Sequence, residues 1–82
     1  MIVFILFSKD KNTFSECLEW LQNKKYNIID LDSLDDIYRF QILPNNKSNL
    51  IKISIDREKQ IEAIVTLDYI KNLKSKNLVY SV

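Results

Sequence analysis

The chain of 82 residues contains no glycine and no histidine, and only one proline and one cysteine. Without glycine it cannot form the glycine-rich loops that cradle phosphates or dinucleotides. Without histidine it lacks the usual proton shuttle, the usual base that activates a serine or cysteine nucleophile, and the commonest metal ligand. These absences exclude most hydrolase mechanisms, so we expect a protein that is not an enzyme and that uses no cofactor and no metal.

The length predicts a single domain over residues 1–82, which is small enough that self-association would help to stabilise it. Cys17 is the only cysteine and cannot form an internal disulfide, which is typical of a reducing compartment. The apolar run 1–7 is far shorter than the roughly 20 residues that span a bilayer, and it has no basic start. We therefore expect a cytoplasmic protein with no membrane contact.

The first half of the chain predicts a strand followed by a helix. Residues 1–7 read as a strand because they are apolar, rich in β-branched and aromatic side chains, and followed by a polar cluster. Thr13 and Glu16 have the spacing of a capping box, which predicts that a helix begins there. An apolar stripe along this helix follows the spacing i, i+3, i+4, i+7, and the helix should end near Lys25; the stripe consists of Phe14, Cys17, Leu18 and Leu21.

The rest of the chain predicts mainly strands, over residues 26–31, 37–43 and 50–55. We expect the last two of these to form a hairpin, because Pro44 and two asparagines separate them. Residues 58–74 fit either a strand or a helix; the period-two pattern favours a strand over 61–67, with a short helix over 68–76 and a strand or loose end over 77–82. The predicted fold class is α+β, a two-layer β-α-β-β-β arrangement with one helix on a mostly antiparallel sheet.

Several motifs share their order and spacing with a known pattern: Phe14-Ser15-Glu16, Trp20-Leu21, Tyr26, Asp30, Tyr38-Arg39-Phe40-Gln41 and Pro44. Together they resemble a small domain that recurs in uncharacterised proteins of phages and large DNA viruses. The resemblance covers about residues 2–67. It implies a β-α-β-β-β layout and a viral or phage-encoded protein inside a host cell, and it implies no activity.

The first strand supplies the main functional hypothesis, because both of its faces are apolar. A single helix covers one face of a sheet, so we expect the face formed by Val3, Ile5 and Phe7 to be covered by the C-terminal segment or by another chain. We favour another chain, either a second copy of this one or a host or viral protein. Trp20 lies off the centre of the helical stripe and is either packed at the edge of the core or an anchor of this interface.

A second hypothesis is binding to nucleic acid by basic residues: Arg39, Lys52, Lys71, Lys74 and Lys76. Tyr38-Arg39-Phe40 resembles the alternation of aromatic and basic residues in single-strand binding surfaces, although core packing of Tyr38 and Phe40 is favoured. The acidic cluster formed by Asp30, Asp32, Asp35 and Asp36 fits a solvated turn better than a cation site. The favoured function is thus a non-catalytic protein–protein interaction module that associates with itself.

Overall fold

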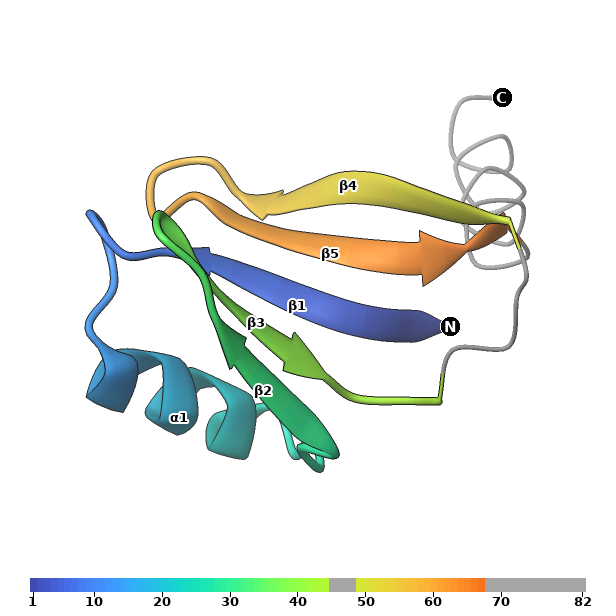
Figure 1. Ribbon diagram of the computed structural model, residues 1–82, viewed down its shortest axis with the longest axis horizontal. Helices are drawn as coiled ribbons and strands as arrows, with labels where there is room; N and C mark the ends of the chain where they lie inside the picture. The colour runs from blue at the N-terminus through green and yellow to red at the C-terminus, as the bar shows by residue number, and fades with distance from the viewer. Residues whose placement is uncertain (45–48, 68–82) are drawn as a thin grey trace, which may run out of the picture.

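The computed structural model describes residues 1–44 and 49–67 and contains one helix packed on one face of a five-stranded sheet (Figure 1). The elements in chain order are β1 (Ile2–Ser8), α1 (Phe14–Asn23), β2 (Asp30–Ser33), β3 (Ile37–Gln41), β4 (Leu50–Asp56) and β5 (Ile61–Thr66). The predicted α+β class and its two-layer arrangement are confirmed.

The sheet is antiparallel throughout, and its strands lie in the order β2-β3-β1-β5-β4. β1 lies at the centre of the sheet. This position suits a strand that is apolar on both faces, because a central strand is the most deeply buried. The two hairpins are β2–β3 and β4–β5. The expected hairpin between the strands at 37–43 and 50–55 is wrong, because β1 and β5 lie between β3 and β4.

The core lies between α1 and one face of this sheet. On that face, Ile5 is opposite Phe40 of β3 and Ala63 of β5, and Phe7 is opposite Tyr38 and Ile61. Cys17 and Leu21 of α1 pack onto these side chains and are buried with them. The predicted core roles of Cys17, Tyr38 and Phe40 are confirmed.

The start of α1 has the predicted capping box. The Glu16 N–H donates to Thr13 Oγ1 (3.2 Å), and the Thr13 N–H donates to Glu16 Oε1 (2.8 Å). Each bond satisfies a donor that the first turn of a helix otherwise leaves free. This local signal in the sequence therefore fixes where the helix begins.

α1 ends in a Schellman motif, in which the N–H of Lys25 donates to Gln22 O and that of Tyr26 to Leu21 O, both at 3.0 Å. The residue after the helix cap must take a left-handed conformation in this motif, and glycine is the usual choice. Because the chain has no glycine, Lys25 takes it, with φ of 63°. The turn between β4 and β5 also contains a residue in the left-handed conformation, Gln60, with φ of 52°.

The later strands match the predicted ones to within one or two residues at most ends, and the second strand differs most, since it spans Asp30–Ser33 instead of 26–31. The second strand begins at Asp30 and not at residue 26, because residues 24–26 close the helix. The ambiguous stretch is a strand over Ile61–Thr66, as the period-two pattern favoured. The helix expected over 68–76 and the strand expected over 77–82 lie outside the described residues.

Candidate functional site

The residues that the sequence assigned to an interface, Val3, Ile5 and Phe7, are buried inside this chain. Their exposed fractions are 3%, 0% and 0%. Ile5 and Phe7 point toward α1 and belong to the core cluster. The helix therefore covers the face that we expected the C-terminal segment or another chain to cover. The alternating pattern defines two faces but does not say which of two apolar faces the helix covers.

The opposite face of β1, which α1 does not cover, is shielded by long polar side chains. Leu6 is only 5% exposed, and its cross-strand neighbours on this face are Arg39 and Glu62. The Arg39 guanidinium lies 5.5 Å from the centre of the Phe4 ring and also pairs with Asp32. Such side chains cover apolar surface with their stems and keep their charges in water. We call this surface the open face.

The basic residues of the nucleic-acid hypothesis do not form one surface among the described residues. Arg39 of β3 and Lys52 of β4 both lie on the open face, but β1 and β5 separate them. Glu62 lies on β5 between them, and Arg39 is paired with Asp32. Lys71, Lys74 and Lys76 lie outside the described residues. Over the described ranges, acidic side chains outnumber basic ones.

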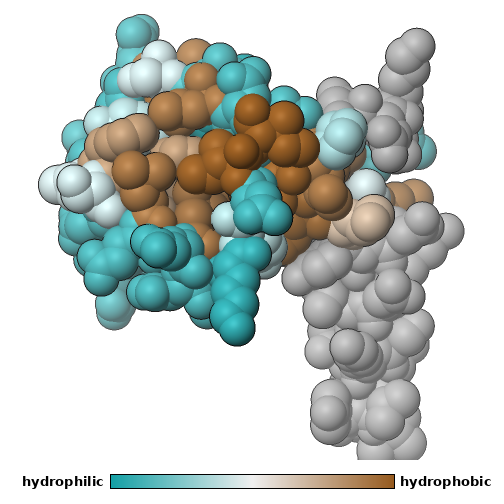
Figure 2. Space-filling view, turned by 90° about the horizontal axis from the view of Figure 1, so that it is seen from below, coloured by the Kyte–Doolittle hydropathy of each residue, from teal (hydrophilic) through white to brown (hydrophobic). Residues whose placement is uncertain are grey.

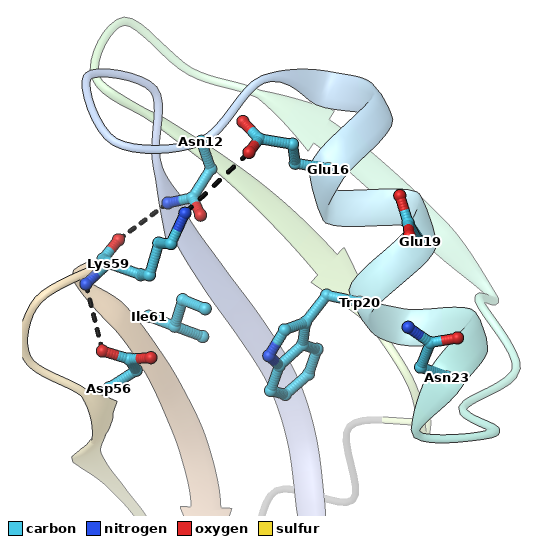
Figure 3. Close-up of a pocket in the computed structure, with 8 residues that line it drawn as sticks. All are labelled: Asn12, Glu16, Glu19, Trp20, Asn23, Asp56, Lys59 and Ile61. Atoms are coloured by element: carbon cyan, nitrogen blue, oxygen red, sulfur yellow. Dashed lines mark hydrogen bonds and ion pairs between the residues drawn. The ribbon is translucent and has the colours of Figure 1, made fainter.

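Trp20 is half-buried and lies beside a hollow of about 300 Å³ between α1 and the β4–β5 turn (Figure 3). Its ring packs edge-on against Phe7 (5.5 Å between centroids) and stacks on Tyr26 (6.3 Å). The hollow is lined by apolar and polar side chains from both sides: Asn12, Glu16, Glu19, Trp20, Asn23, Asp56, Lys59 and Ile61. Trp20 thus packs at the edge of the core.

Most polar groups of this hollow are bonded to one another. Asn12 Nδ2 donates to Lys59 O (2.7 Å), the Lys59 N–H donates to Asp56 Oδ1 (3.0 Å), and Lys59 Nζ lies 3.9 Å from Glu16 Oε2 (Figure 3). These contacts tie the β4–β5 turn to the segment that leads into α1. The hydrogen bonds and the ion pair of the hollow therefore stabilise the fold, and they leave few polar groups free to bind a ligand.

The pKa values of Glu16 and Cys17 are both shifted away from neutral pH. The backbone hydrogen bond from Thr13 is the main cause that lowers the pKa of Glu16. Burial, followed by the nearby Glu16 carboxylate, raises the pKa of Cys17 to about 11. A general acid or base works best when its pKa lies near the working pH, and a thiol is a poor nucleophile while protonated. Neither group is suited to catalysis.

An apolar surface that the core does not explain lies on α1 and around β2 among the described residues. Viewed from below, hydrophobic side chains form a band across the molecule (Figure 2). Large apolar residues of this region are exposed by 37% to 54%, and we call them the α1–β2 patch: Phe14, Leu18, Ile28, Ile29, Leu31 and Leu34.

The α1–β2 patch is continuous with the core through aromatic contacts. The Phe14 ring stacks on buried Phe40 (6.1 Å) and meets the edge of Tyr38 (5.4 Å). Leu31 lies opposite Phe40 in the sheet and so faces the same side. The sequence placed Phe14 and Leu18 on the apolar stripe of the helix; the structure leaves them partly exposed, because none of the described strands lies beyond β2.

Comparison of the chain with models of protein families, with curated proteins and with solved structures finds no match. Residues 1–44 and 49–67 contain no group of three or more His, Cys, Asp or Glu side chains placed to hold a metal ion. The same ranges hold no helix with the length and hydrophobicity needed to traverse a lipid bilayer.

Proposed function

We propose that this protein is a non-catalytic protein–protein interaction module that docks through the α1–β2 patch. The observation that carries the proposal is the exposure of large apolar side chains on α1, on β2 and beside β2, on a molecule that shows a hydrophobic band when viewed from below (Figure 2). Soluble monomers rarely expose contiguous apolar surface, and where they do it marks an interaction site. A cytoplasmic setting and a viral or phage origin belong to the same proposal.

The patch suits docking because its central side chain is already held in place. Phe14 is fixed by its contacts with Phe40 and Tyr38, so little conformational entropy is lost when a partner covers it. Leu18 lies one helical turn further on and is 38% exposed. Burying both side chains against a partner gives the hydrophobic stabilisation that anchors of protein interfaces supply.

The test replaces Leu18 by aspartate and compares what the wild-type protein and the variant capture in cells that express them. The matched control is Asn23→Asp, which adds the same charge on the same helix outside the α1–β2 patch. We expect the wild-type protein and the control to retain the same proteins, quantified by mass spectrometry, and Leu18→Asp to lose them. Equal retention by all three, with folding verified by circular dichroism, contradicts the proposal.

A further inference from the structure

The two outer strands of the sheet, β2 and β4, run in the same direction. Each of the four strand pairings is antiparallel, so direction alternates along the order β2-β3-β1-β5-β4 and the first and last strands agree. Figure 1 shows both arrows pointing toward the same end of the molecule. A second copy placed beside the first in the same orientation would therefore bring β4 of one next to β2 of the other as parallel neighbours.

On the side of α1, both edges present apolar residues. Leu31 of β2 lies opposite buried Phe40, and Ile51 of β4 lies opposite buried Val65, so both face α1's side of the sheet. Each of these two edge residues is 37% exposed, and Ile29, just before β2, is 54% exposed. An outer strand with exposed apolar residues is a template for pairing with another strand.

On the open face, the two edges carry opposite charges. Asp30 of β2 lies opposite Gln41, and Lys52 of β4 lies opposite Ile64, which places both on the open face. Among the described residues neither belongs to an ion pair; Asp30 Oδ1 accepts the N–H of Leu31 (2.8 Å). The acidic edge and the basic edge are thus complementary at the same level of the sheet.

We propose that a second copy of this chain adds its β4 beside β2 and continues the sheet. Asp30 then meets Lys52 on the open face, and on the side of α1 Leu31 meets Ile53 while Ile29 meets Ile51. Pairing β2 with β2 would bring the two acidic edges together, and pairing β4 with β4 in the register centred on Lys52 would bring two lysines together; neither symmetric arrangement supplies the Asp30–Lys52 contact. The inference rests on the proposed function, because β2 contributes to the α1–β2 patch.

This contact is head-to-tail, since each copy uses a different edge at each junction. Such an interface does not close in a dimer; it forms a ring or an open helical assembly. The twist between neighbouring strands, about −20° to −25°, rotates each added copy relative to the last. The weight-average mass should therefore keep rising with protein concentration instead of stopping at twice the monomer mass.

The test measures that mass by light scattering and sedimentation over a concentration series, at low and high salt, for the full chain and for Asp30→Lys and Lys52→Asp. We expect the wild-type protein to associate, more weakly at high salt, and each single variant to weaken association by about tenfold or more. An equimolar mixture of the two variants restores association, because each supplies the edge that the other lacks. The double variant Asp30→Lys with Lys52→Asp restores it within one chain.

A wild-type protein that stays monomeric at every concentration overturns this inference, as do single variants that associate like the wild type or a mixture that stays monomeric. A rise in association for Asp30→Lys alone indicates pairing of β2 with β2 and also overturns it. Leu18 lies outside both edge strands, so Leu18-dependent capture of other proteins by a monomeric wild type leaves the proposed function intact.

Discussion

At the scale of single residues, the absence of glycine leaves strain at two turns. Lys25 and Gln60 both have positive φ, where the Cβ atom of an ordinary residue crowds the backbone. A residue other than glycine in this region costs about 1–2 kcal/mol. The folded state bears this cost at the end of α1 and in the β4–β5 turn, so both turns can be improved by substitution.

The first prediction concerns Lys25. We expect Lys25→Gly to raise the free energy of unfolding by about 0.5–1 kcal/mol, since relief of the positive φ exceeds the added flexibility of the unfolded chain. Urea denaturation followed by circular dichroism measures the change. The control is Lys24→Gly, which removes the same side chain at a position with φ of −86° and should lower stability. Equal effects of the two substitutions would show that strain at Lys25 is negligible.

The second prediction concerns the thiol of Cys17, whose pKa burial raises from its ordinary value of 9.0 to about 11. Above pH 9 the thiol ionises first in the unfolded chain, so ionisation lowers the free energy of the unfolded state while the folded state still holds the thiol protonated. The contribution of Cys17 to stability is therefore complete below pH 9 and lost as the pH rises toward 11.

The measurement for Cys17 is urea denaturation at several pH values from neutral to about 11, on the wild type and on Cys17→Ala. The variant is less stable at neutral pH because a buried side chain is truncated. The difference in unfolding free energy between the two proteins should shrink as the pH rises. A difference that stays constant would mean that the folded state does not keep the thiol protonated.

At the scale of elements, Asn12 joins the segment before α1 to the β4–β5 turn. Asn12 is buried, and its Nδ2 donates to Ser8 O (3.0 Å) and to Lys59 O (2.7 Å). The loop after the central strand and a turn far along the chain are thereby held together. The amide fits this role because one side-chain nitrogen supplies two donors to two carbonyls.

The third prediction, which belongs to the scale of elements, is that Asn12→Asp lowers the free energy of unfolding by about 2–3 kcal/mol, because a carboxylate replaces the donor and faces two carbonyl oxygens. Thermal unfolding by circular dichroism measures the loss. Asn23→Asp is the control, since Asn23 is exposed and the same chemical change there should alter stability little. A similar shift in both variants would show that the two bonds of Asn12 contribute nothing specific.

The sequence predicts the position of an element that has a local signal, but it does not predict which strands lie next to one another in the sheet. The capping box of Thr13 and Glu16 located α1, and alternation located the strand at 61–67. The order of strands depends on which pairings bury most apolar surface, which no local pattern contains. Thus the prediction of a hairpin between residues 37–43 and 50–55 was wrong. The prediction that α1 leaves the face of Val3, Ile5 and Phe7 uncovered was wrong as well.

At the scale of the whole molecule, the α1–β2 patch exists because the described part of the sheet does not cover the whole apolar stripe of α1. Phe14 and Leu18 share an apolar stripe with Cys17 and Leu21, and the sequence gives no reason to separate these two pairs. They separate because, among residues 1–44 and 49–67, β2 is the last strand on this side of the sheet, so the described strands leave one side of the stripe partly exposed. Only the assembled fold distinguishes exposed apolar residues from core residues on this stripe.

The central position of β1 also governs how the chain can fold. β1 is the first strand in the sequence, yet its two neighbours are β3 and β5, so its pairing is complete only after residues beyond 60 are available. Contacts between distant parts of a chain form slowly, because loop closure must come first. During synthesis the two apolar faces of β1 emerge from the ribosome well before either partner strand. A chaperone that shields short apolar segments should therefore raise the yield of folded protein more than it raises final stability.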